Sequence, residues 1–251
     1  MARRWLVAMV FAVFGALAQA EEATTAPSVI HLASEDWEDY TAADGHGLGW
    51  DVLRKVFEPA GVKLDIRSEP YVRSMGLAER GEVDACVGSY HEESSDVLYP
   101  RWNFDTDHIY ALGLASSPQP TPQTLGNYRL AWVRGYDYQD YLPNIRRYNE
   151  VLRRTGIVSM LTQNRADFYI DALTEVDWVL SRAKDPSQFR RTHIAELPLY
   201  LCFAKTPAAR SLMALFDQRM AQLVKSGELR PIFERWKQPY PFDENEQLSG
   251  Q

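Results

Sequence analysis

The spacing of apolar and polar positions in residues 47–90 alternates between two periods. Val52 and Val56 stand about one helical turn apart, whereas Leu64 and Ile66 alternate with polar residues. The predicted elements are a helix over residues 50–59, a strand over 62–67, a helix over 71–80 and a strand over 85–88. Strands that alternate with helices predict a parallel sheet, because parallel neighbours need a long crossover connection.

The same alternation continues on both sides of a Pro-rich break at residues 116–122. The further predicted elements are strands over residues 29–33, 108–115, 128–133, 166–170 and 197–204, and helices over 156–163, 173–183, 208–226 and 229–236. Two α/β units joined by two crossings predict a clam-shell with a ligand cleft between its lobes. The predicted segments are lobe 1 in residues 28–115 plus 200–238, lobe 2 in 119–197, a first crossing in the Pro-rich break and a polar tail in 243–251.

Residues 1–20 have the pattern of a cleaved secretory signal peptide. Arg3 and Arg4 precede an uncharged apolar run over residues 5–17, and the segment closes on small residues at Ala20. The run is too short to span a bilayer comfortably, and no later segment is apolar enough to do so. We therefore expect a soluble protein exported to the periplasm.

The composition narrows the range of partners and cofactors. The whole chain carries a net charge of −7, which disfavours nucleic acid and anionic membranes as partners. Cys86 and Cys202 lie in apolar, strand-like segments, and both a disulfide and two buried thiols stay open. The five histidines show no ligand spacing, so we predict neither a metal site nor a cofactor. They are His31, His46, His91, His108 and His193.

A series of short motifs follows the predicted elements in order. They are the helix start of residues 47–52, Tyr71-Val72-Arg73, the LAERGEVD of residues 77–84, Thr124-Leu125, Val133-Arg134-Gly135, the pattern of residues 164–171, and residues 226–229 with Trp236. In this order the chain resembles, over residues 29–236, the bacterial extracellular solute-binding proteins of polar amino acid ABC transporters. The resemblance implies a type II periplasmic-binding-protein-like clam-shell, a small-molecule ligand and a membrane transporter permease as partner.

The chain departs from the family pattern in the loop after the predicted strand over residues 85–88. Many family members carry T-x-x-R there, and the arginine binds the α-carboxylate of an amino acid in a bidentate pair. Residues 91–96 read instead HEESSD, with no arginine and three acids. A ligand carboxylate would meet like charge in this loop, so we expect an amine-bearing ligand. Arg73 and Arg101 are the two arginines that would replace the missing one.

Three polar candidates follow from the motifs. Asp171 matches the position from which family members bind a ligand's ammonium group, and its alternative role is a helix N-cap before Leu173. Arg73 begins a predicted helix, where a cation is unfavourable unless an anion lies nearby. Its predicted partner is a ligand carboxylate, and the alternative is a salt bridge to Glu35, Asp36 or Glu69. Gly135, in the glycine turn of lobe 2, is the third candidate.

Aromatic and acidic side chains supply the remaining candidates. Tyr90, Tyr40 and Trp37 are predicted to stack on the ligand at the cleft mouth, and ordinary partly buried packing is the alternative. Tyr90 follows the end of a predicted strand, the usual ligand side of an open α/β sheet. Glu92, in the acidic loop of residues 91–96, either faces solvent or biases the cleft toward amines.

Three functions stay open at this point. The first is a non-catalytic, monomeric binding protein that closes on a small polar solute, an amino acid or a related compound, and presents it to a transporter. The second is a dehydratase on the same clam-shell, for which Glu92, Glu93 or His91 would serve as general acid or base. The third is a receptor that reports ligand binding to a partner sensor.

Overall fold

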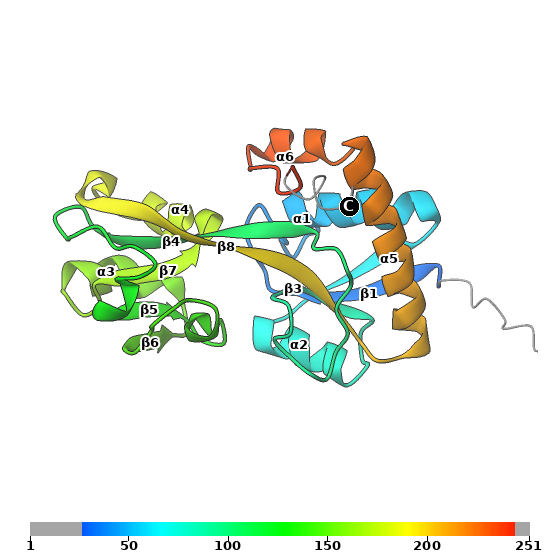
Figure 1. Cartoon of the computed structure of the whole chain (residues 1–251), viewed down its shortest axis with the longest axis horizontal. Coiled ribbons are helices and arrows are strands. Elements are labelled where there is room, and N and C mark those ends of the chain that lie inside the picture. Colours follow the sequence, from blue (N-terminus) through cyan, green and yellow to red (C-terminus); the bar gives the residue numbers. More distant parts are fainter. Residues whose placement is uncertain (1–26, 244–251) are drawn as a thin grey trace, which may run out of the picture.

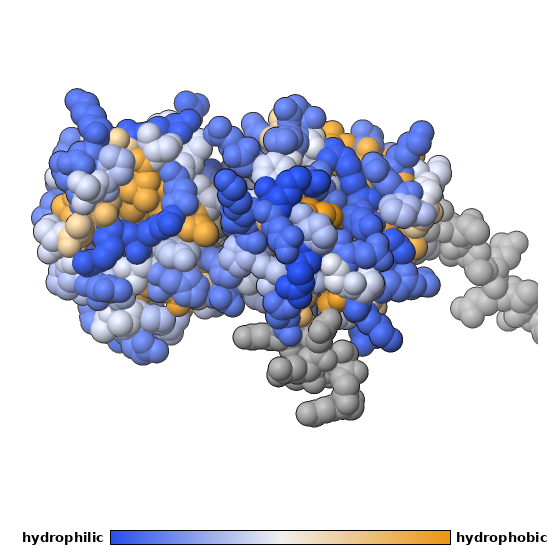
Figure 2. Space-filling model, turned by 90° about the horizontal axis from the view of Figure 1, so that it is seen from above, coloured by the Kyte–Doolittle hydropathy of each residue, from blue (hydrophilic) through white to orange (hydrophobic). Residues whose placement is uncertain are grey.

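The computed structural model describes residues 27–243 of the 251-residue chain. The predicted signal peptide, residues 1–20, and the predicted tail beyond residue 243 lie outside the described range. Within that range, no helix combines the length and the apolar character needed to cross a membrane. The surface seen from the side of α4 and α6 is mostly hydrophilic, with smaller hydrophobic areas among the hydrophilic residues (Figure 2).

Eight strands and six α-helices make up the described fold. The strands are β1 Val29–Ser34, β2 Lys63–Ser68, β3 Ala85–Ser89, β4 Asp105–Leu114, β5 Leu130–Val133, β6 Tyr148–Val151, β7 Phe168–Ala172 and β8 Phe189–Phe203. The α-helices are α1 Leu48–Phe57, α2 Tyr71–Glu79, α3 Ile157–Thr162, α4 Leu173–Ser181, α5 Pro207–Ser226 and α6 Arg230–Trp236. Short 3-10 helices are η1 Glu58–Ala60, η2 Leu125–Asn127, η3 Tyr138–Asp140, η4 Arg154–Gly156 and η5 Pro186–Gln188.

All eight strands belong to one curled sheet in the order β2-β1-β3-β8-β4-β7-β5-β6. The strand β1 is parallel to β2 and β3, and β5 is parallel to β6 and β7, as the alternation of helices and strands predicted. The pairs β3–β8, β4–β8 and β4–β7 are antiparallel. The parallel prediction is therefore correct for β1, β2 and β3 in the first lobe and for β5, β6 and β7 in the second. It is wrong for β4 and β8, the strands that pass between the lobes (Figure 1), because they pair antiparallel with each other and with β7 and β3.

The chain crosses between the lobes in the β4–β8 ladder. This ladder runs from Asp105 opposite Leu199 to Leu114 opposite Phe189, and β8 then continues beside β3 in the first lobe. The Pro-rich residues 116–122, predicted as the first crossing, instead follow the end of β4 that is farthest from the first lobe. Two paired strands satisfy each other's backbone hydrogen bonds where the chain passes between the lobes. A proline-rich loop cannot do so, because proline has no backbone N–H to donate.

Two helix layers cover the sheet of the first lobe. The helices α1, α5 and α6 lie on one face and α2 on the other (Figure 1). Trp50 and Phe57 of α1 pack with Phe216 of α5 in the first core, where all three side chains are fully buried. A second apolar cluster begins at α2 and continues into the second lobe through Tyr71 and Tyr136. The two lobes therefore share buried surface and are closed on each other.

A disulfide joins Cys86 to Cys202. The sequence had left open whether these cysteines form a disulfide or remain two buried thiols. The two residues stand directly opposite in the antiparallel β3–β8 pair, with their Cα atoms 5.0 Å apart. This separation falls within the range that a disulfide requires. Both cysteines belong to the first lobe, so the covalent loop encloses the whole second lobe.

Candidate ligand-binding site

A cavity lies between the lobes, beside the strands that join them. The volume open to the centre of a water molecule is about 50 Å³. Its aromatic lining consists of Trp37, Tyr40, Tyr71, Tyr90, Tyr136 and Tyr138, and its acidic lining of Glu93, Asp105, Asp107, Asp171 and Glu175. No lysine or arginine is among its lining residues, all of which belong to the described part of the chain. The walls therefore combine aromatic surface with carboxyl groups.

The predicted aromatic candidates all line this cavity. The Trp37 and Tyr40 rings pack with their centroids 5.5 Å apart, and Tyr90 makes an edge contact of 4.7 Å with Tyr141 of the opposite lobe. A Cβ atom on Gly88, whose φ is 91°, would lie 2.8 Å from the Trp37 ring. Glycine at this position thus allows the tryptophan to pack against the end of β3.

Two aspartates of β4 form the acidic wall beside the crossing strands. The Tyr40 hydroxyl donates to Asp105 Oδ2 at 2.8 Å, and the Tyr90 hydroxyl donates to Asp107 Oδ2 at 3.1 Å. Burial raises the pKa of Asp105 to about 7 against the hydrogen bonds it accepts from Thr106 and Tyr40. Burial also raises the pKa of Asp107 strongly, and the nearby Asp105 charge adds to it. The raised pKa values mean that these two carboxyl groups tend to hold protons in the empty cavity. A bound cation would stabilise their ionised forms and take the place of those protons.

The acidic loop contributes Glu93 rather than Glu92 to the cavity. Glu93 accepts hydrogen bonds from the Tyr71 hydroxyl at 2.6 Å, Ser89 Oγ at 2.9 Å and the Tyr90 backbone amide at 3.1 Å. Burial raises its pKa, although these hydrogen bonds act in the opposite direction. Glu92 has a φ of 64°, and its side chain is 85% exposed, outside the cavity. Neighbours in a turn point in different directions, which their sequence alone did not reveal.

Arg154 does not line the cavity but pairs with acids that do, and no sequence motif pointed to it. Its Nε lies 3.1 Å from Asp171 Oδ2 and 2.9 Å from Glu175 Oε2, and its NH1 lies 3.9 Å from Glu35 Oε1. It also donates to the Tyr136 hydroxyl. Burial raises the pKa of Glu35, and that of Glu175 to about 8, while Arg154 acts to lower both. One guanidinium therefore serves two buried carboxyl groups, Asp171 and Glu175, together with the partly exposed Glu35. It has little capacity left for a ligand carboxylate.

Asp171 lines the cavity at the end of β7 and is almost fully buried. Besides Arg154, its carboxylate accepts hydrogen bonds from the Tyr169 hydroxyl and from the Ala172 backbone amide, the latter at 2.9 Å. The alternative role as an N-cap is not observed, because α4 is capped by Ala172 without a side-chain hydrogen bond. Asp171 thus contributes negative charge that Arg154 partly balances.

Two predicted polar candidates lie away from the cavity lining. The Arg73 side chain is 61% exposed and pairs with Glu69, its Nε lying 3.2 Å from Glu69 Oε2, as the alternative interpretation proposed. Gly135 forms a turn with a φ of 85°, and its amide donates to Glu150 Oε1 at 3.3 Å. A Cβ at this glycine would approach Val72 of α2 to 2.5 Å. The absence of a side chain at Gly135 therefore lets the second lobe pack closely against α2 of the first lobe. The adjacent Tyr136 lines the cavity.

Polar contacts hold the lobes together around the cavity. The Tyr136 hydroxyl donates to Glu35 Oε2 at 3.2 Å, and Trp178 Nε1 donates to Glu38 Oε2 at 2.9 Å. Both contacts join the loop after β1 to the second lobe. The Tyr71 and Tyr136 rings also meet edge to face with centroids 6.1 Å apart. The structure is therefore a closed form of the clam-shell.

Comparison with known proteins identifies this architecture. No protein-family model matches the chain, and no curated protein matches it in sequence. Among solved structures, the substrate-binding protein of an amino acid ABC transporter has a TM-score of 0.63 at 17% identity, covering 83% of this chain and 98% of that one. A histidine kinase sensor domain with similarity to periplasmic binding proteins has a TM-score of 0.67 at 17% identity, covering 83% and 95%.

A third solved structure is a binding protein described as the precursor of an enzyme. It is the ancestral amino acid-binding protein AncCDT-1, a precursor of cyclohexadienyl dehydratase, with a TM-score of 0.64 at 14% identity, covering 83% of this chain and 95% of that one. The fold is thus the two-lobed, type II periplasmic-binding-protein-like clam-shell. At this level of identity the likeness establishes the fold, and the function has to be argued from the cavity itself.

Proposed function

We propose that this chain is an exported solute-binding protein that closes on an organic cation with one or more amine groups. The observation that supports this most directly is the cavity wall of six aromatic rings and five carboxyl groups. Ammonium groups bind favourably over aromatic faces and beside carboxylates, especially where water is excluded. A simple amine or diamine fits these walls better than an amino acid, because Arg154 is already paired with three acids.

The raised pKa values give the proposal a measurable signature. The Asp105 carboxyl, with its pKa near 7, is partly protonated in the empty site at neutral pH. A bound cation favours the ionised form, so binding releases a proton. If one proton is displaced, the affinity for a permanently charged cation rises about tenfold between pH 6 and pH 8. An affinity that is constant over this range would contradict the coupling.

The proposal is tested by thermal shift on the purified mature protein. The panel contains diamines, quaternary ammonium compounds, basic amino acids and acidic amino acids. A ligand at about 100 times its Kd stabilises by about 2.7 kcal/mol, which raises Tm by several degrees in a chain of this size. We expect stabilisation by the diamines or the quaternary ammonium compounds. Stabilisation by acidic amino acids alone would refute the proposal.

A matched pair of variants separates site charge from total charge. Asp107→Asn removes a carboxyl group that lines the cavity, whereas Asp65→Asn removes one from exposed edge strand β2. Both substitutions replace one carboxyl group by a neutral amide of the same shape. We expect only Asp107→Asn to weaken binding of the active cation, by about tenfold or more, since hydrogen-bonded charges contribute about 1.5–3 kcal/mol. Equal losses in both variants would indicate a general effect of charge.

The role of the closed form follows from the same proposal. We infer that a transporter permease in the membrane is the partner that receives the solute, in line with the sequence resemblance. A sensor partner is the competing possibility, because one structural neighbour is a sensor domain. Co-purification with a permease encoded beside this chain would support the first role, and co-purification with a membrane kinase would support the second.

A second candidate function is a dehydratase on the same clam-shell. One observation favours it, the Asp105 carboxyl in the cavity with a pKa near the operating pH of a general acid. Hydrogen bonding from Tyr40 and Thr106 holds this group in place. Proton NMR of the bound solute after prolonged incubation distinguishes the functions, because a binding protein returns the solute unchanged and a dehydratase does not.

A further inference from the structure

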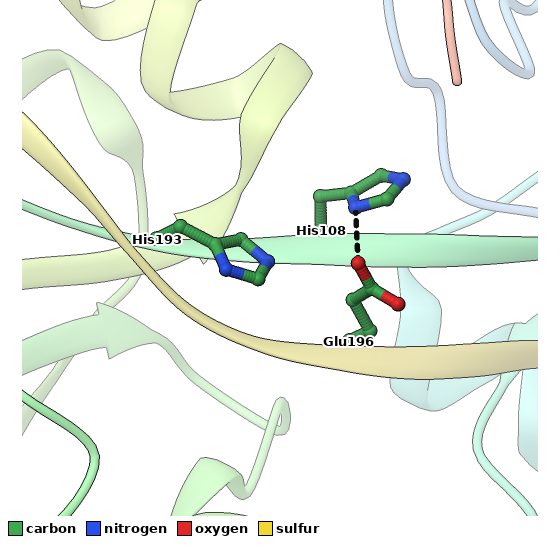
Figure 3. A group of neighbouring side chains, drawn as sticks. All are labelled: His108, His193 and Glu196. Atoms are coloured by element: carbon green, nitrogen blue, oxygen red, sulfur yellow. Dashed lines mark ion pairs between the residues drawn. The ribbon is translucent and has the colours of Figure 1, made fainter.

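Two of the five histidines meet on the strands that join the lobes. His108 lies in β4 and Glu196 stands opposite it in β8, with His108 Nδ1 3.4 Å from Glu196 Oε1. His193 of β8 approaches the same place. One ligand atom from each of these three side chains lies within 4.8 Å of the other two (Figure 3).

A β-bulge is the reason that all three side chains face the same way. The β4–β8 register shifts between Ile109, which is opposite Ala195, and Tyr110, which is opposite His193. Paired residues of a ladder point to the same side of a sheet, and alternate residues of one strand do so as well. The extra residue in β8 therefore turns His193 to the face that carries His108 and Glu196. Bulges commonly redirect a functional side chain in this way.

The three side chains have the chemistry of a transition-metal site. Two imidazoles and one carboxylate form a known zinc-binding set, which leaves one coordination position for water or another ligand. Bond lengths near 2.0 Å in a tetrahedral arrangement place donor atoms about 3.3 Å apart. The His108–Glu196 pair already meets this spacing. His193 has to move by about an ångström or more, which an exposed side chain does by a small rotation.

The position is open to solvent on one side and to the ligand cavity on the other. The Glu196 side chain is 59% exposed, which provides an entry path for an ion, and His108 also lines the cavity. The Tyr110 ring packs against His193 at 5.2 Å and supports its orientation. An isolated surface ion pair between His108 and Glu196 would need neither His193 nor the bulge.

From this geometry we propose that His108, His193 and Glu196 bind one divalent transition-metal ion, with zinc as the natural probe. A bound ion would join β4 to β8 at the place where the chain passes between the lobes. This inference does not depend on the identity of the solute, because the site lies on the crossing strands themselves. It replaces the sequence-based expectation that the histidines are unrelated.

The test is calorimetric titration of zinc chloride into tag-free, full-length mature protein in the absence of organic cations. We expect one ion per chain in the wild-type protein. His193→Ala and Glu196→Gln should each weaken binding by at least about tenfold, by analogy with the loss on removing even a supporting group of a metal site. The matched control is His31→Ala, which removes an exposed histidine of β1 next to Asp84. It should bind zinc like the wild type.

Cobalt(II) provides a second readout that reports the ligands directly. The visible absorption of the bound ion in wild-type protein should be lost in His193→Ala and kept in His31→Ala. Both altered histidines are exposed, so unfolding is not expected, and circular dichroism checks it. Absence of one-to-one zinc binding in the wild type, or identical binding by wild type and His193→Ala, would overturn the proposal.

Discussion

The buried Asp105 makes a prediction about the stability of the ligand-free protein. Its pKa is raised from 3.8 to about 7 in the folded chain, because burial penalises the charged form. The folded state therefore holds a proton that the unfolded state releases as the pH rises above about 4. The stabilisation from this group is complete below that pH, and it is lost progressively as the pH rises to about 7.

The magnitude follows from the size of the pKa change. The full difference corresponds to about 4 kcal/mol at 1.36 kcal/mol per pKa unit. Between pH 5 and pH 8 the part that is lost amounts to about 2–3 kcal/mol. Asp105→Asn keeps an oxygen that accepts from the Tyr40 hydroxyl and cannot ionise. The variant should thus gain about 2–3 kcal/mol relative to wild type over this pH range.

Urea unfolding at pH 5, 6, 7 and 8 measures the difference. The free energies of unfolding for wild type and Asp105→Asn should diverge as the pH rises, with the variant the more stable at pH 8. Asp65→Asn controls for the loss of one negative charge at an exposed position. Parallel curves for wild type and Asp105→Asn would refute the reasoning, because they would mean that Asp105 ionises alike in both states.

Three further predictions concern covalent and packing features. The double variant Cys86→Ser/Cys202→Ser should lose about 3–5 kcal/mol of unfolding free energy, because the disulfide closes a loop with a sequence separation of 116; unchanged urea midpoints would contradict this. Arg154→Met should cost about 3–5 kcal/mol at pH 8 by leaving buried carboxylates unpaired, and less at pH 5 where Glu175, with its pKa raised to about 8, is protonated; an equal loss at both pH values would argue against the charge mechanism. Gly88→Ala should lower Tm more than Gly61→Ala, since both glycines have positive φ but only the first would meet a tryptophan ring; equal shifts would exclude that contact as the cause.

Much of the fold was predictable because its signals are local. The helix that the sequence placed over residues 71–80 is α2, Tyr71–Glu79, and the strand over 85–88 is β3, Ala85–Ser89. The periodicity of each element can be recognised within its own segment, without knowing which other segment it packs against. The strand β8 was expected only from residue 197, although it begins at Phe189. Its first half carries charged side chains on an exposed face, and it is held by its pairing with β4 rather than by apolar alternation.

The candidate site was predicted less completely, because it depends on contacts between distant segments. Tyr90 was chosen from its place after a predicted strand, Asp171 from the family resemblance, and Tyr40 and Trp37 as aromatic side chains expected at the cleft mouth. All four line the cavity. Arg154 belongs to a short segment with no strong period, and only the folded chain brings it to its three acids. Two signals were available in the sequence, namely the excess of acids near the cleft and the absence of the usual arginine.

The two-lobed class, the alternation of elements and the acidic, aromatic character of the cleft can be predicted from the order of residues alone. These properties depend on composition and on spacings of two to four residues, which every segment carries with it. The folded chain was needed to show that Cys86 joins Cys202, that Glu93 enters the cavity, and that His108 meets His193. Each of these depends on the register between strands or on the direction of a turn, and a shift of one residue moves a side chain to the opposite face.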